Sequence, residues 1–130
     1  MSTREQELNA NVIEFRKELD RSITRGAHRI SLFIGHLKEN ADTAFVGYAD
    51  KAMAVAADIQ VKEQVRAAIE HGLASGKAID LIIKDLHTWA LKTALNAAEY
   101  PERSTSVVSN FQAQLRGAAW AEMVRSLESL

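Results

Sequence analysis

The chain has 130 residues, of which 47% are hydrophobic and 25% are charged, and its formal net charge is −1. This length and composition fit one globular domain, residues 1–130, and exclude a largely disordered chain. The balanced charge disfavours a protein that coats nucleic acid. The chain has no cysteine, which excludes disulfides and thiolate metal sites, and no leader or apolar stretch of membrane-spanning length. We therefore expect a cytoplasmic protein that does not enter a membrane.

Apolar residues recur at spacings of three and four along the whole chain, Pro101 is the only proline, and Asn-Gly and Asp-Gly hairpin signals are absent. This pattern predicts an all-α fold, a bundle of four to five helices with an unusually long first helix. The first stripe predicts one helix of about 38 residues, roughly 57 Å long. Its members are Leu8, Val12, Phe15, Leu19, Ile23, Gly26, Ile30, Phe33 and Leu37. The alternative is two helices that are broken near Arg25–Gly26.

The later helices are predicted from caps and breaks. Asp42 or Thr43 is the expected N-cap of an alanine-rich second helix, and Asp58 predicts a kink near residues 58–61. A third helix is expected from about Lys77 to Glu99, because Pro101 cannot continue it. Its inward face is expected to carry Ile79, Ile82, Ile83, Leu86, Trp89, Ala90, Leu91, Thr93 and Ala97. Ser104, Thr105 or Ser106 is expected to cap the last helix.

Catalytic and metal-binding patterns are weak. The four histidines form neither the Glu-x-x-His pairs of a di-iron bundle nor a His-Glu-x-x-His motif. The stretch from Gly72 to Ala78 resembles a phosphate-binding loop, but it has three residues between its glycines where the motif needs four, and Ala78 replaces the magnesium-binding hydroxyl. We therefore predict no enzyme activity, no cofactor and no metal.

Two patterns are compatible with nucleic acid. Residues 64–81 have the spacing of a helix-turn-helix unit, with Ala68 at the helix crossing, Gly72 in the turn at a positive φ, and Lys77 and Lys84 on the second helix. Asp80 on that same helix would be repelled by phosphate. The second pattern is a basic ridge on the first helix, formed by Lys17, Arg21, Arg25 and either His28 or Arg29. Neighbouring acidic residues favour a solvated face there, so nucleic acid remains the alternative partner.

The length of the first stripe leads to the expected function. A helix of this length exceeds what a compact bundle of this mass needs, so part of the stripe is expected to pack on another chain. We therefore predict a non-enzymatic protein-binding or assembly protein that acts as a homo-oligomer. The expected interface residues are Leu8, Val12, Phe15, Leu19, Ile23, Gly26 and Ile30. A helix-turn-helix DNA-binding regulator that uses residues 64–81 is the alternative.

Overall fold

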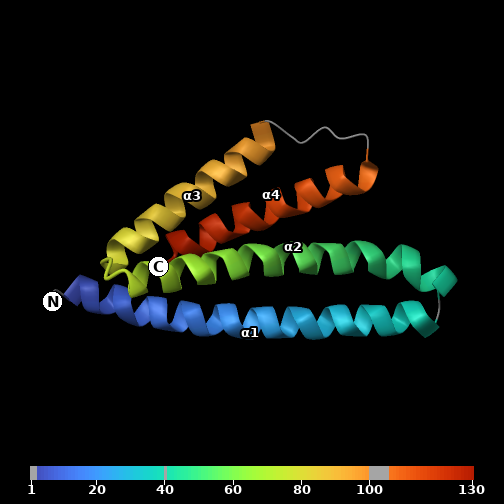
Figure 1. The fold of residues 1–130 in the computed structure, drawn as a ribbon, viewed down its shortest axis with the longest axis horizontal. Helices are drawn as coiled ribbons and strands as arrows, with labels where there is room; N and C mark the ends of the chain where they lie inside the picture. The colour runs from blue at the N-terminus through green and yellow to red at the C-terminus, as the bar shows by residue number, and fades with distance from the viewer. Residues whose placement is uncertain (1–2, 40, 100–105) are drawn as a thin grey trace.

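The described part of the chain is helical except for the turn at residues 75–78, residue 106 and the last two residues. The computed structural model describes residues 3–39, 41–99 and 106–130, and the side chains of all of these except residues 37, 41–48 and 108. These residues form α1 (Thr3–Glu39), α2 (Ala41–Ala74), α3 (Ile79–Glu99) and α4 (Val107–Glu128) (Figure 1). The all-α class and the long first helix are confirmed, and the described ranges contain four helices.

The first helix continues through Gly26 without a break, which confirms the single long helix. Gly26 is buried where α1 crosses α2. A Cβ built on Gly26 would lie 2.8 Å from Ile59 Cδ1 and 3.2 Å from Val55 Cγ1. A glycine is needed here because the two helices approach more closely than a side chain allows.

The second helix begins earlier than expected and continues through the region where a kink was predicted. It starts at Ala41, so Asp42 and Thr43 lie in its first turn, and it continues through residues 58–61 to Ala74. The prediction of an N-cap at Asp42 or Thr43 is therefore wrong, and the helix is not interrupted where the kink near residues 58–61 was predicted. Asp58 pairs with Lys62 at 2.7 Å, one turn further along the same helix. Such a pair supports a helix interior, as do the alanines around it.

The turn between α2 and α3 is built around Gly76. Lys77 N–H donates to the Gly72 carbonyl at 3.0 Å, and Gly76 N–H donates to the Leu73 carbonyl at 3.1 Å. Gly76 has a φ of 75°. This is the Schellman arrangement, which places a left-handed residue directly after the helix. The prediction that Gly72 adopts a positive φ is wrong, because Gly72 lies inside α2 and is buried against Ile82.

The last two helices form a second hairpin. The structure starts α3 at Ile79, two residues after the predicted start at Lys77. Ser106 is the N-cap of α4, and its hydroxyl accepts a hydrogen bond from Ser109 N–H at 3.2 Å. One of the three predicted caps is thus confirmed, while Ser104, Thr105 and Pro101 lie outside the described residues.

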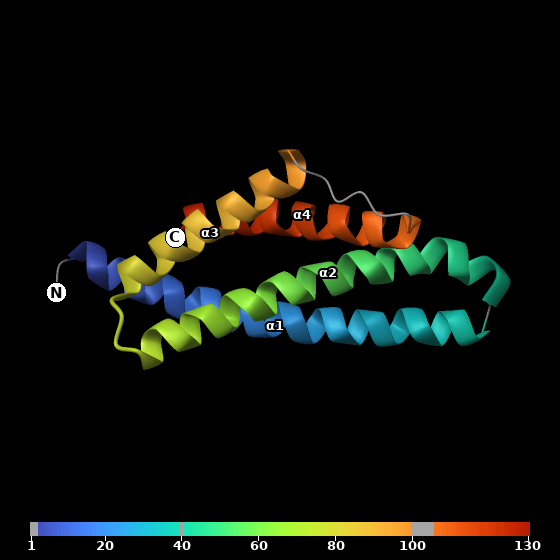
Figure 2. The ribbon, with the colours of Figure 1, turned by 45° about the horizontal axis from the view of Figure 1, so that its top comes forward.

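The helices form two antiparallel pairs, α1 with α2 and α3 with α4, and α2 contacts both helices of the second pair. In Figure 2, α1 and α2 cross each other. The core lies where all four helices meet, and Val65 and Ile69 on α2 are at its centre with 0% exposure. The far end of the first pair extends past α3 and α4 (Figure 1). We call residues 27–39 and 41–52 the arm, and none of its described side chains is fully buried.

Candidate functional site

Most of the residues expected at an interface on α1 pack instead in or against the core of a single chain. Val12 and Leu19 each retain 2% of their exposure, and Ile23 and Gly26 are also buried. Leu8 and Phe15 are half-buried and pack against the core, and Ile30 is half-buried in the arm. A second chain could reach the most buried of these side chains only if the bundle opened. The apolar surface that is accessible to a partner therefore lies elsewhere.

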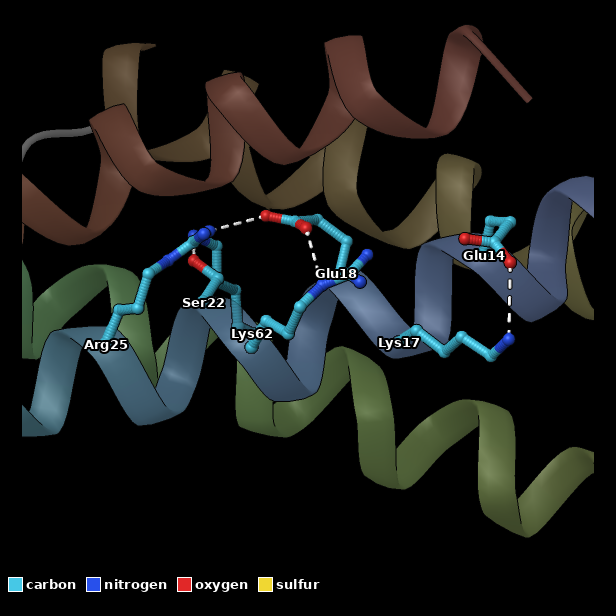
Figure 3. A network of polar contacts seen from close by, with 7 residues as sticks. Glu14, Lys17, Glu18, Ser22, Arg25 and Lys62 are labelled. Carbon is cyan, nitrogen blue, oxygen red and sulfur yellow. Dashed lines mark hydrogen bonds and ion pairs between the residues drawn. The ribbon is translucent and has the colours of Figure 1, made fainter.

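The basic ridge on α1 is paired with carboxylates of the same helix (Figure 3). Lys17 contacts Glu14 at 3.3 Å, and Glu18 accepts from Arg21 Nε at 3.1 Å and from Arg25 Nη2 at 2.6 Å. The hydrogen bond from Arg25 is the main reason why the pKa of the Glu18 carboxyl is lowered. A cation that is already paired presents less positive potential to a phosphate backbone, so the two carboxylates offset most of the charge of the three cations.

The ridge also borders a groove between α1 and the end of α4, with a volume of about 530 Å³. Ser22 and Lys62 line it and are hydrogen-bonded to each other (Figure 3). Phe15 and Met123 supply apolar walls. The Ser22 hydroxyl and the Lys62 amine are thus in hydrogen-bond contact, and the same amine also pairs with Asp58 at 2.7 Å.

The predicted helix-turn-helix corner has the turn length of such a unit, with residues 75–78 between α2 and α3. Its charges are less suitable for DNA. Lys77 forms an ion pair with Asp85, and Asp80 lies in the first turn of α3 near the exposed Lys84. These two cations and two carboxylates leave the corner without net charge, whereas affinity for DNA depends on cations that neutralise phosphates.

Other chemical classes of site find little support in the described residues. No three His, Asp or Glu side chains among them converge in a way that could hold a metal ion. None of the described helices carries an apolar segment long enough to cross a bilayer.

The structure reveals one exposed apolar face that the sequence reasoning had not separated from the core. On α3, Leu81, Leu91 and Leu95 retain 48%, 38% and 50% of their exposure. They lie opposite the buried face that holds Ile82, Ile83, Leu86 and Ala90. With 100° per residue, the exposed residues share a stripe about 100° wide. We call this stripe the α3 seam, and its members are Leu81, Lys84, Thr88, Leu91, Leu95 and Ala98.

A signal for the α3 seam is present in the sequence. Leu81, Thr88 and Leu95 are spaced by seven residues, and so are Lys84, Leu91 and Ala98. These two series occupy the a and d positions of a coiled-coil heptad, where three of the six residues are leucine and two, Lys84 and Thr88, are polar. This heptad pattern is hard to recognise in the sequence, because apolar residues on two opposite faces of a helix can be taken for one broad apolar face.

Comparisons with models of protein families, with curated proteins and with solved structures find no match to this chain. The functional argument therefore rests on the surface of the molecule.

Proposed function

We propose that the chain is a non-enzymatic protein-binding protein that acts as a homo-oligomer, in the cytoplasm, and that the α3 seam is its contact surface. The observation that supports this most is the exposure of three leucines on one face of a helix whose opposite face is in the core. A row of exposed leucines at coiled-coil spacing is typical of a helix that packs on another helix.

The expected strength of self-association follows from the leucines. Full burial of a leucine side chain is worth about 1.5–3 kcal/mol, and half-exposed leucines therefore contribute roughly 1 kcal/mol each. Three leucines from each of two copies give about 6 kcal/mol, which only just offsets the lower estimates of about 4–15 kcal/mol for lost translation and rotation. Packing of Thr88, Ala98 and the Lys84 stem adds to this total. With the lowest of these costs the leucines leave about 2 kcal/mol, and a similar contribution from the other seam residues gives a weak dimer, with a dissociation constant in the range of about 0.1–1 mM.

Sedimentation equilibrium or light scattering over about 10 µM to 1 mM tests this range. The measured mass should rise from 14.4 kDa toward twice that value as the concentration increases. Leu91→Lys places a charge in the seam and should keep the protein monomeric. Because lysine is a good helix former, this substitution should leave α3 folded. Ile34→Lys is the matched control, because Ile34 is 47% exposed but lies in the arm.

Two outcomes would contradict the proposal. A mass that stays at 14.4 kDa over the whole range would refute self-association. A loss of association in Ile34→Lys, with Leu91→Lys unaffected, would move the contact surface from α3 to the arm. Circular dichroism of each variant confirms that the helices remain folded, so that a change in mass reports the surface.

A further inference from the structure

The α3 seam also carries information about the identity and direction of its partner. All six members are exposed, so the heptad positions face solvent over eighteen residues. The positions that flank a seam set the choice of partner and its orientation, because their charges meet across the interface. On one flank of the seam lie Asp85, Lys92 and Glu99, and on the other lie Asp80 and His87.

We propose that the helix that covers the seam is α3 of a second copy, in antiparallel orientation. This inference rests on the proposed function, since it assumes that the seam is the surface of self-association. In antiparallel packing, a positions of one helix meet d positions of the other. Residues 81, 84 and 88 of one copy then lie opposite residues 98, 95 and 91 of the other, and a two-fold axis passes beside residues 89 and 90. Such a contact is closed and uses the same patch twice.

Charge complementarity selects this direction. Asp85 and Lys92 lie on the same flank, one heptad apart, and have opposite charges. When the second copy runs antiparallel, Asp85 of each copy lies beside Lys92 of the other, which makes two ion pairs related by symmetry. Lys77 already contacts Oδ2 of Asp85, and Oδ1 of this carboxylate can accept from a further cation.

A parallel second copy would meet repulsion at the same positions. Parallel pairing brings one flank of each helix against the opposite flank of the other, so that Asp80 of one copy approaches Asp85 of the other. It also places Lys84 directly against the second Lys84. In the antiparallel arrangement Lys84 faces Leu95, so that its hydrocarbon stem packs on the leucine while the ammonium group reaches solvent.

The position of α3 in the molecule permits this contact. Both ribbon views show α3 along the outer edge of the bundle, on the side away from α1 over most of its length (Figures 1 and 2). Two copies can therefore approach through α3 while the arms point away from the contact.

The absence of cysteine from the chain allows a direct test of direction by disulfide formation. Two single variants, Leu81→Cys and Ala98→Cys, are mixed at a concentration where the wild type is dimeric and are oxidised. In the antiparallel arrangement residues 81 and 98 face each other, while each residue lies about seventeen positions, or roughly 25 Å, from its own copy. A disulfide needs Cα atoms within about 7 Å, so only the mixed product should form. Mass spectrometry distinguishes it from the two homodimers.

Homodimeric products from each variant alone would overturn the antiparallel arrangement in favour of a parallel one. If the wild type dimerises but no cysteine pair is cross-linked, the seam is not the contact, and the inference about the second copy fails while self-association stands. If the wild type does not dimerise at all, the proposed function itself fails.

A charge exchange gives an independent readout. Lys92→Asp should raise the dissociation constant of the dimer by about 3–10-fold, because it replaces two weak surface ion pairs by two repulsive contacts. Adding Asp85→Lys to this variant restores opposite charges across the antiparallel contact and should recover most of the lost affinity. A double variant that associates more weakly than Lys92→Asp would contradict the arrangement.

Discussion

The close approach of α1 and α2 at Gly26 leads to a quantitative prediction for one substitution, Gly26→Leu. Even a Cβ at this position would lie 2.8 Å from Ile59 Cδ1, and leucine adds three more carbon atoms in the same direction. Overpacking of this kind costs about 1–3 kcal/mol. Leucine is also a better helix former than glycine, by about 0.8–1 kcal/mol. We expect the free energy of unfolding to fall by a net value of about 1–2 kcal/mol.

The same helix provides a matched control nine residues further along. A Cβ built on Gly35 meets nothing within 4 Å, so Gly35→Leu gains helix propensity without a clash. This variant should be more stable than the wild type by up to about 1 kcal/mol. The same substitution at two glycines of one helix should therefore differ in its effect by about 1–3 kcal/mol, because only the packing against Ile59 and Val55 distinguishes the two positions.

Urea unfolding followed by circular dichroism at 222 nm measures both effects, at one low protein concentration so that association does not contribute. The slope of the unfolding free energy against urea should be unchanged in both variants. If Gly26→Leu and Gly35→Leu are equally stable, α1 and α2 do not approach closely at Gly26, and the close crossing of these helices is misplaced.

Three further predictions concern a cap, a titrating group and the DNA alternative. Ser106→Ala should reduce the free energy of unfolding by about 1 kcal/mol, since it removes the N-cap of α4, whereas Ser109→Ala retains the backbone N–H donor and should have less effect. The lowered pKa of Glu18 means that its ion pairs stabilise the fold above the carboxyl's ordinary value of 4.5 and that this contribution is lost as the pH falls through the lower folded value; Glu18→Gln should flatten this part of an acid unfolding profile. Fluorescence anisotropy with genomic duplex fragments at ~0.1 M salt should show no binding, because Asp85 pairs with Lys77 at the corner; salt-sensitive binding that Lys77→Glu abolishes would favour the helix-turn-helix alternative.

The fold class could be predicted from sequence because it depends on local periodicity. The stripe from residue 8 to residue 37 marked one helix, and Gly26 did not break it because a buried glycine in a helix costs only about 1 kcal/mol relative to alanine. The turn after α2 was less certain from sequence. Gly72 and Gly76 both lie near its end, and only the approach of Ile82 to the first and the φ of 75° at the second separate their roles.

The candidate surface could not be predicted with the same success, because the exposure of a stripe depends on which helices cover it. The stripe on α1 was expected to extend to a second chain, yet Val12 and Leu19 are covered by the chain's own helices. Leu91 and Trp89 were both assigned to the inward face of α3, and both are exposed, at 38% and 41%. Trp89 nevertheless meets Trp120 of α4 edge-on, with ring centroids 4.7 Å apart. These contacts join residues that are distant in the sequence, so they cannot be predicted from the local periodicity of apolar residues.

The arm gives one helix two different stabilities. The backbone hydrogen bonds of α1 continue from Thr3 to Glu39, but its buried side chains lie between residues 12 and 26. Amide protons in that segment are released only when the whole core opens, whereas those of the arm can exchange by local opening of two helices. Amide hydrogen exchange should therefore be faster in α1 after Gly26 than before it. In α2 it should become faster toward the start of the helix, although neither helix is broken. The bundle can in this way open from the tip of the arm inward while the end that carries the α3 seam stays folded.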